Sequence, residues 1–277
     1  MILVTGATGN IGRALLEDLR AHGAGPVRAL TRDPGRAAFP EGVEAVRGDL
    51  SDPASVERAW GGVRALFLVP HLGPASELLG AARRAGVERV VLVSSITVLT
   101  HPHLAPARQH AEVEEQVRAS GLEWTVLRPT QFASNTLMWA PAIRAREAVR
   151  APYADVGLPT VHPGDIAAVA RAALTGPGHH GRAHTLTGPA LVTPRGQVEA
   201  IGAALGRRIP FVETGRAEAR ARMAAVFGAE GADAVLDVTG GDLRDGLLEV
   251  HDTVGRVTGV PARPFGRWAE ENAGAFR

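Results

Sequence analysis

Short apolar runs alternate with amphipathic stretches along the first half of the chain. The runs are rich in Val, Ile, Leu and Ala, and the stretches between them repeat apolar residues at the spacing of a helix buried on one side. This alternation predicts an α/β fold with a Rossmann-type, doubly wound parallel sheet. The predicted strands are Ile2–Thr5, Val27–Thr31, Val43–Arg47, Ala65–Val69, Arg89–Val93 and Trp124–Leu127. The predicted helices lie around Ile11–His22, Ala54–Trp60, Ala75–Ala85 and Ala107–Ser120.

The pattern changes after Pro129. Longer helical stretches follow, separated by Pro- and Gly-rich loops, with short strands expected at Gly157–Val161 and Ala183–Leu186. We predict a Rossmann domain over residues 1–135 and a smaller, partly helical C-terminal substrate-binding region over residues 136–277. The second region is expected to pack on the first, with no clear linker between them.

Residues with capping chemistry mark several helix ends. Asp52 and Thr193 each precede a proline that would occupy the first helical position, so both are expected N-caps. Asp165 is expected to cap another helix in the same way. Gly86 and Gly121 are expected to end the helices before them, because glycine tolerates the left-handed conformation found there.

Composition limits the classes of partner. Hydrophobic residues make up 45% and charged residues 21% of the 277, and the net charge is +1 with scattered arginines, so we expect no nucleic-acid partner. The chain begins MILVTGATG, without the basic start and apolar run of a signal peptide, and no apolar stretch reaches about 18 residues. We therefore expect a cytoplasmic protein, monomeric or homodimeric, that acts on a small molecule and not at a membrane.

Two residue types are absent from the chain. The lack of cysteine excludes disulfides, thiol nucleophiles and cysteine-based zinc sites. All 30 basic residues are arginine, so Schiff-base catalysis and lysine-dependent phosphate loops are excluded as well. The histidines that cluster have no fixed carboxylate partner in the sequence, and we expect no metal site. They are His101 and His103 before one helix, and His179, His180 and His184 near a Gly-rich turn.

A G-x-x-G-x-x-G loop follows the first predicted strand and opens the first helix. Gly6 permits the tight turn, Gly9 lets the backbone approach a pyrophosphate, and Gly12 allows close packing of the helix. The start of the helix supplies amide donors and a favourable dipole. Its position between strand and helix favours dinucleotide binding over a purely structural turn. Thr8, Asn10 and Ile11 are expected to line the phosphates.

The end of the second predicted strand indicates which dinucleotide is bound. NAD-binding proteins usually carry an acidic residue there to hold the ribose hydroxyl, whereas this chain has Arg32. A guanidinium can hold a 2′-phosphate with two hydrogen bonds, so we expect NADP(H), with Arg36 able to share the role. Alternatively, Arg32 is a solvated residue that pairs with Asp33.

The third predicted strand is followed by Gly48, Asp49 and Leu50. We expect this segment to meet the adenine, with the Asp49 carboxylate accepting a hydrogen bond from the exocyclic amine. The alternative is an ordinary loop aspartate.

These motifs together resemble the NmrA-like, atypical branch of the short-chain dehydrogenase/reductase superfamily. The likeness is carried by TGATGNIG, GDLSDP, LFLVP, VVLVSS and SGLEWTVLRPTQFASN, and it is strong up to Asn135 and faint beyond. The resemblance implies further cofactor contacts at the carboxyl ends of strands, where ligands of open α/β sheets bind. They are Leu68, Val69 and Pro70 along the cofactor, Ser94 near the nicotinamide ribose, and Pro129, Thr130 and Phe132 around the nicotinamide. Ser94 and Ser95 could equally cap a turn.

The chain departs from its parent superfamily at the catalytic residues. Most of those enzymes use a Tyr-x-x-x-Lys pair, which cannot exist without lysine, and the single tyrosine, Tyr153, lies far from the expected helix. The resemblance to isoflavone-reductase-like proteins makes His110 the counterpart of their lysine, so His110 is a candidate proton donor. Alternatively, His110 is a solvated helix residue that only neighbours Glu112 and Glu114. Tyr153 could reach the substrate, or it could be a packed tyrosine with a satisfied hydroxyl.

These observations favour an NADPH-dependent reductase that transfers a hydride to a small organic acceptor. The acceptor could be a quinone, an activated C=C or C=N bond, or a ketone, and the missing pair weakens the case for simple ketones. The main alternative is a non-catalytic redox sensor that binds NADP(H) and a partner protein, as NmrA-type regulators are thought to do. A nucleotide-sugar epimerase is a weaker alternative, because such enzymes normally keep the Tyr-Lys pair.

Overall fold

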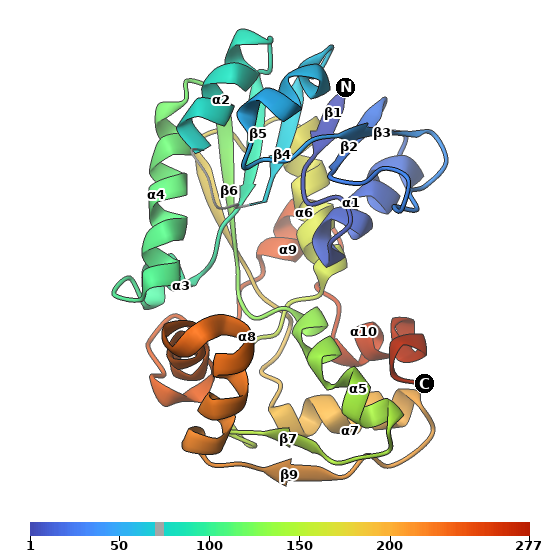
Figure 1. The fold of residues 1–277 in the computed structure, drawn as a ribbon, viewed down its shortest axis with the longest axis vertical. Helices are drawn as coiled ribbons and strands as arrows, with labels where there is room; N and C mark the ends of the chain where they lie inside the picture. The colour runs from blue at the N-terminus through green and yellow to red at the C-terminus, as the bar shows by residue number, and fades with distance from the viewer. Residues whose placement is uncertain (70–74) are drawn as a thin grey trace.

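The main sheet of the protein is parallel throughout. The computed structural model describes residues 1–69 and 75–277, and within them seven strands are ordered β3-β2-β1-β4-β5-β6-β8 (Figure 1). This is the Rossmann strand order extended at one edge by β8, so the expected doubly wound sheet is confirmed. The strands are β1 (Ile2–Val4), β2 (Val27–Thr31), β3 (Val43–Arg47), β4 (Ala65–Leu68), β5 (Arg89–Val93), β6 (Glu123–Pro129) and β8 (Arg182–Leu186).

Helices cover both faces of this sheet. Ile2 and Val4 point into one hydrophobic core and Leu3 into another, because neighbouring side chains of a strand point to opposite faces. A sheet buried on both sides requires the nearly continuous apolar strands seen in the sequence. One face packs against α1 (Asn10–Ala21), α6 (Pro163–Thr175) and α9 (Thr253–Thr258). The other packs against the 3-10 helix η1 (Pro53–Trp60), α2 (Ala75–Arg84) and α4 (Ala105–Ala119), and the short α3 (Thr97–Thr100) precedes α4.

Two of the three predicted N-caps are confirmed. Asp52 accepts a hydrogen bond from the Ala54 N–H (3.1 Å), and Thr193 accepts one from the Gly196 N–H (3.0 Å). The prediction for Asp165 is wrong, because the side chain of His162 caps α6 and Asp165 lies inside the first turn. A neutral imidazole nitrogen can accept the free N–H of a helix start as an oxygen does.

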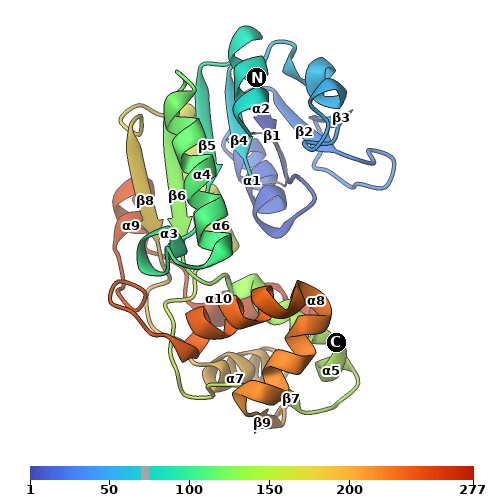
Figure 2. The same cartoon turned by 60° about the vertical axis from the view of Figure 1, so that its left-hand side comes forward.

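A second body, here called the lower lobe, lies beyond the carboxyl ends of the strands (Figures 1 and 2). Its core joins residues such as Ile143, Val198 and Trp268. Its helices are η2 (Ala133–Trp139), α5 (Ala140–Arg144), α7 (Pro194–Ala204), α8 (Arg216–Leu236), the π-helical turn η3 (Asp237–Gly241), α10 (Phe265–Glu271) and η4 (Ala273–Phe276). Its strands β7 (Val149–Ala151) and β9 (Phe211–Glu213) form a separate parallel pair.

The two strands predicted after Pro129 have different outcomes. The segment Gly157–Val161 forms no strand and makes only isolated bridges, Leu158 with Val192 and Val161 with Phe132. The segment around Ala183 does form a strand, β8, but it pairs with β6 in the main sheet. The chain therefore returns to the sheet after entering the lower lobe, while the division at residue 135 stays a prediction. Among the described helices, none is long and apolar enough to cross a membrane.

Candidate functional site

The strand order reverses between β1 and β4, and a single side chain joins their carboxyl ends. The Thr5 hydroxyl donates a hydrogen bond to the Phe67 carbonyl (3.0 Å) and accepts one from the Val69 N–H (2.9 Å). Gly6 follows with a φ of +59°, and a Cβ there would lie 3.0 Å from the Val69 side chain. Ligands of open α/β sheets bind where the strand order reverses, so the glycine loop begins at the expected crevice.

The glycine loop is shaped by close backbone contacts. The Gly9 N–H donates to the Gly6 carbonyl (2.9 Å), and a Cβ on Gly12 would lie only 2.2 Å from that same oxygen. Thr8, Gly9 and Asn10 are exposed at the start of α1, where backbone N–H groups have no partner within the helix. Such a cradle fits the pyrophosphate of a dinucleotide. The side chain of Ile11 points the other way, into the core.

The end of β2 presents Arg32 to solvent. The carboxylate of Asp33 accepts a hydrogen bond from the Gly35 N–H (3.2 Å) and lies 3.8 Å from the Arg36 guanidinium. The contacts of Asp33 thus run to Gly35 and Arg36, whereas the alternative interpretation paired it with Arg32. The role of Arg32 at a 2′-phosphate stays a prediction.

Asp49 forms a local turn at the end of β3. Its carboxylate accepts hydrogen bonds from the backbone N–H (3.0 Å) and the hydroxyl (2.8 Å) of Ser51. Its own N–H donates to the Ser55 hydroxyl (2.8 Å), and the neighbouring Leu50 is half-buried beside the core. These bonds order the loop, and a contact with adenine stays a prediction, as do the contacts of Leu68 and Val69. Pro70 lies outside the described residues.

Ser94, directly after β5, points into the protein. Its hydroxyl donates a hydrogen bond of 2.6 Å to Glu114, which lies on α4 and is completely buried. Ser95 behaves differently, because its hydroxyl accepts from the N–H (3.2 Å) and the hydroxyl (2.8 Å) of Thr97. Ser95 therefore caps a turn, as the alternative interpretation allowed, whereas Ser94 does not.

Glu114 also binds two arginines. Arg128, on β6, donates from Nε to Oε1 (2.9 Å) and from a terminal nitrogen to Oε2 (2.6 Å), and Arg118 donates to Oε2 (2.5 Å). Burial alone would raise the pKa of Glu114, but the hydrogen bonds from Arg128 and Ser94, the charge of Arg128 and the hydrogen bond from Arg118 lower that pKa overall. The carboxylate is therefore ionised at neutral pH.

His110 lies one helical turn before Glu114, on the same face of α4. The Nδ1 atom is buried and has no hydrogen-bond partner within residues 1–69 and 75–277. Burial lowers the pKa of the imidazole, and the charge of Glu114 opposes this with a smaller effect. His110 is therefore mainly neutral at neutral pH, and it is less exposed than the solvated-helix alternative assumes.

The segment after β6 leads into the lower lobe. Pro129 is the last residue of the strand, and the Thr130 hydroxyl donates to the Pro159 carbonyl (2.5 Å). Phe132 is half-buried against the core and pairs with Val161 in an isolated bridge. The predicted nicotinamide contacts thus come from the link between the sheet and the lower lobe.

Tyr153 belongs to a separate cluster in the lower lobe. Its hydroxyl accepts a hydrogen bond from Arg216 (3.0 Å), which also binds Asp237 (2.8 Å). A Cβ on Gly240 would lie 2.4 Å from the aromatic ring, so the ring packs against bare backbone. Tyr153 itself has a φ of 56°, a strained value for a residue with a side chain of this size. These contacts match the packed tyrosine of the alternative interpretation.

A second buried carboxylate lies where α6 begins. Asp165 accepts a hydrogen bond from the Arg263 N–H (2.7 Å), and the Arg263 guanidinium is 3.4 Å away. Burial raises the pKa of Asp165 to about 6, against the smaller lowering by Arg263. His162 contacts Glu271 of α10 (3.1 Å), and its pKa is lowered first by burial and then by the charge of Arg263. These contacts join α6 to the C-terminal segment.

Several of the clustered histidines contact neighbouring side chains or the backbone, and His103 lies 4.0 Å from the Asp242 carboxylate. His101 is buried and makes hydrogen bonds with the Thr100 hydroxyl (2.8 Å) and the Asp242 carbonyl (2.7 Å). The rings of His179 and His184 are joined by one hydrogen bond of 3.3 Å. Among the described residues, no three His, Asp or Glu side chains are grouped so as to hold a metal ion.

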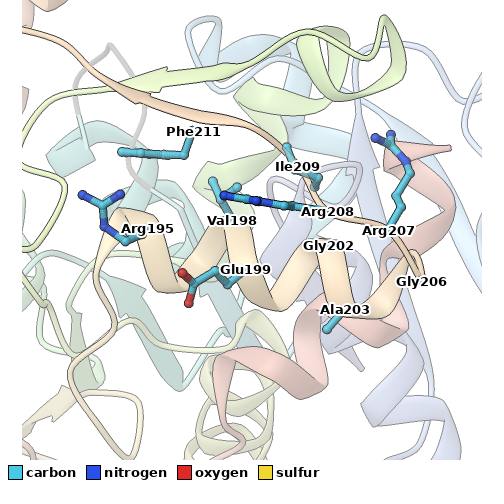
Figure 3. Close-up of a pocket in the computed structure, with 10 residues that line it drawn as sticks. All are labelled: Arg195, Val198, Glu199, Gly202, Ala203, Gly206, Arg207, Arg208, Ile209 and Phe211. Carbon is cyan, nitrogen blue, oxygen red and sulfur yellow. The ribbon is translucent and has the colours of Figure 1, made fainter.

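A groove of about 490 Å³ opens on the lower lobe between α7 and β9 (Figure 3). Arg195 stacks over the ring of Phe211, at 5.3 Å from its centre, and pairs with Asp155 (2.9 Å). The residues that line the groove include none of those predicted to contact the cofactor or the substrate. The candidate site is therefore defined by the strand ends and not by this groove.

Sequence analysis missed Glu114 and Arg128 as site residues. The available signal was spacing, because Glu114 lies seven positions after Ala107 and three before Val117, on the buried stripe of the helix. A charged residue at a core position requires a buried partner. Arg128 at the end of an apolar strand is that partner.

Comparisons with known proteins agree with this geometry. A family model described as NAD(P)H-binding matches residues 6–177. A (4-alkanoyl-5-oxo-2,5-dihydrofuran-3-yl)methyl phosphate reductase from Streptomyces griseus is 43% identical over 282 residues, covering 100% of this chain and 99% of that protein. An NAD(P)H azoreductase from Xenophilus azovorans is 36% identical over 284 residues, with coverage of 100% and 99%. The crystal structure of an NADPH-dependent quinone oxidoreductase from Escherichia coli superimposes with a TM-score of 0.79 at 26% identity, covering 100% of both chains.

Proposed function

The chain belongs to the NAD(P)H-binding family and is an oxidoreductase, and we propose that it uses NADPH to reduce an electron-poor carbon–carbon double bond in a small organic molecule. Quinones and azo compounds, the acceptors in the names of two relatives, are electron-poor in the same sense. A simple ketone is the least favoured acceptor of those considered.

One observation carries this choice of acceptor. The relative from Streptomyces griseus, similar over its whole length, is named for a substrate with a ring double bond that bears an alkanoyl group and adjoins the ring carbonyl. Hydride addition to such a bond leaves an anion shared between two carbonyl oxygens, and water can protonate that anion. An acceptor of this kind does not require a strong protein acid.

The residues of the chain are consistent with an acceptor that needs no strong protein acid. The chain has no lysine, and its only tyrosine has a hydroxyl that already accepts a hydrogen bond from Arg216. When bound, NADPH supplies the hydride. What remains for the protein is to hold the two reactants in register and to exclude water.

We assign the cofactor contacts by position in the fold. The glycine loop would hold the pyrophosphate, Arg32 the 2′-phosphate, and the ends of β5 and β6 the nicotinamide. The proposed set is Gly6, Thr8, Gly9, Asn10, Ile11, Gly12, Arg32, Asp49, Leu50, Leu68, Val69, Ser94, Pro129, Thr130 and Phe132. His110 is the proposed proton donor, in the minor protonated form that its lowered pKa allows. Tyr153 is the weaker candidate, because its hydroxyl already binds Arg216.

The test is a panel of acceptors with NADPH oxidation as the readout. The panel contains an acyl-substituted dihydrofuranone phosphate, a simple enone, a quinone, an azo dye and an unactivated ketone. We expect the doubly activated double bond to react fastest and the ketone slowest. A preference for the ketone would overturn the proposed acceptor. Tight NADPH binding in calorimetry with no turnover of any compound would overturn the proposed reductase function and favour an NADP(H) sensor.

A further inference from the structure

We propose that Glu114 is a positioning residue that fixes Ser94 and the ends of β5 and β6 around the nicotinamide end of the cofactor. The inference rests on the proposed function, because that function places hydride transfer at these strand ends. Glu114 itself is buried below them and acts through the residues that it binds.

Three elements converge on the carboxylate of Glu114. Ser94 follows β5, Arg128 lies in β6 one residue before Pro129, and Glu114 lies on α4. The backbone joins the two strand ends as well, because the Ser94 N–H donates to the Leu127 carbonyl (2.7 Å) and the Ile96 N–H donates to the Pro129 carbonyl (3.1 Å). The side chains of Ser94 and Arg128 add a second link at the same place, because both bind the Glu114 carboxylate. Glu114 thus holds together the two strand ends that must contact the nicotinamide.

The hydrogen-bonding capacity of the Glu114 carboxylate is fully used. A carboxylate has about four acceptor positions, and Glu114 uses them for Ser94, for two nitrogens of Arg128 and for Arg118. A buried ionic group whose hydrogen bonds are all satisfied has few alternative arrangements. The side chain of Glu114 is 1% exposed, so water offers no competing partner. The position of Ser94 relative to β6 is therefore tightly defined.

The hydrogen bond between Ser94 and Glu114 has a fixed direction. An ionised carboxylate only accepts, so the single proton of the Ser94 hydroxyl is committed to Glu114. What remains on the Ser94 oxygen is acceptor capacity. A ligand group that meets Ser94 must then be a donor, such as a ribose hydroxyl or the N–H of a carboxamide. Glu114 thereby selects the polarity of the contact that Ser94 offers.

A structural ion pair would behave differently from a positioning residue when it is altered. E114Q keeps the shape of the side chain but replaces one acceptor by an N–H₂ donor, which faces donors already in place. We expect kcat to fall by about tenfold or more, because small misplacements of reacting groups cost that much. We expect the NADPH Kd to change by less than about threefold, since the glycine loop on β1 and α1 supplies the phosphate contacts.

A readout that is independent of turnover is the fluorescence of bound NADPH. Its intensity and lifetime report on how the nicotinamide is held, so both should change in E114Q. The control is E115Q, an exposed glutamate on the same helix, which should match the wild type in kcat, Kd and emission. If E114Q does not fold, S94A provides the same comparison, because it leaves the bonds from Arg128 and Arg118 to Glu114 in place.

A double variant separates action through Ser94 from a general effect. If Glu114 acts through Ser94, S94A/E114Q should be no slower than E114Q alone, whereas independent effects would multiply. Unchanged kcat and emission in both single variants would overturn the proposal. So would a lower melting temperature with unchanged kcat per bound NADPH. If the wild type reduces no acceptor, the proposed function fails, and the emission of bound NADPH still decides the role of Glu114.

Discussion

The two ends of the candidate site are built in contrasting ways. The glycine loop is made from seven consecutive residues, Gly6–Gly12, and works through backbone groups that are exposed at the start of α1. The proposed nicotinamide end is made from side chains of Ser94, His110, Glu114 and Arg128, on three elements, and most of its polar atoms are buried. One end depends on the absence of side chains, and the other depends on charged side chains meeting inside the protein.

The contrast shows how each end can fail. A local backbone cradle fails when a single atom is added, because backbone neighbours cannot move aside. A buried network fails when a charge is removed, because the remaining partners are left unpaired. Substitutions at the two ends should therefore have separate effects, one on cofactor binding and the other on hydride transfer.

The largest effect is expected at Gly12. In G12V the added Cβ would lie 2.2 Å from the Gly6 carbonyl oxygen, a backbone atom, so the loop must open. NADPH binding should be undetectable or weakened by about 100-fold or more in a calorimetric titration, which corresponds to about 2.7 kcal/mol or more of binding free energy. The control is G266A, where a Cβ would meet nothing within 4 Å. NADPH binding by G12V at wild-type strength would mean that the loop is not the cradle.

The next effect concerns Asp165, the buried carboxylate without the double arginine pairing of Glu114. Its pKa is about 6 in the folded state against 3.8 ordinarily, so the folded protein holds a proton that the unfolded chain has released between these values. The free energy of unfolding contributed by Asp165 falls as the pH rises through this window and stays low above it. D165N removes this loss in the free energy of unfolding, which is about 3 kcal/mol at neutral pH.

The measurement for Asp165 is denaturant unfolding of D165N and wild type at neutral pH and near the ordinary carboxyl pKa. The variant should gain on the wild type as the pH rises. The pKa of His162 is lowered, so its contribution to the free energy of unfolding is lost as the pH falls. Because His162 is present in both proteins, this contribution cancels in the difference between them. A difference independent of pH would mean that Asp165 is ionised throughout.

Substitution of Arg32 tests which dinucleotide binds at the glycine-loop end of the site. R32A should weaken NADPH binding by roughly 1.5 to 3 kcal/mol, the strength of a hydrogen bond to a charged group, and leave NADH binding almost unchanged. Calorimetry with both cofactors measures the ratio. The matched variant R36A reports whether the second arginine shares the phosphate. Equal weakening for both cofactors in R32A would remove that residue from the 2′-phosphate.

The smallest effect is expected at His110. Its pKa is lowered, so only a minor fraction is protonated at neutral pH and the wild-type rate should rise as the pH falls toward that pKa. H110Q should lose this rise and, at neutral pH, turn over within about tenfold of the wild type, since water can protonate a stabilised anion. The check is the pH dependence of kcat. An unchanged profile in H110Q would assign the proton to solvent alone.

The same contrast explains what could be predicted from the sequence. The glycine loop, the succession of strands and helices in the first half and the caps at Asp52 and Thr193 depend on neighbours in the chain, so their residues carry the signal. The pairing of Glu114 with Arg128, the place of β8 and the cap at His162 depend on which distant segments meet. The prediction of a strand at Gly157–Val161 was wrong for the same reason, because Leu158 packs with the distant residues Ile96 and Leu247 and the segment makes only isolated bridges.

The path of the chain between the sheet and the lower lobe limits how the protein can be rebuilt. The chain enters the lower lobe after β6, returns for α6 and β8, leaves again, returns for α9, and leaves once more for α10. No single cut separates the two bodies, and a fragment ending at residue 135 would expose the edge of β6 that β8 covers. Exchanging the lower lobe with that of a relative would require several junctions transplanted together. If the lower lobe binds the substrate as predicted, new specificities are more accessible by point substitution within the lobe than by recombination at one boundary.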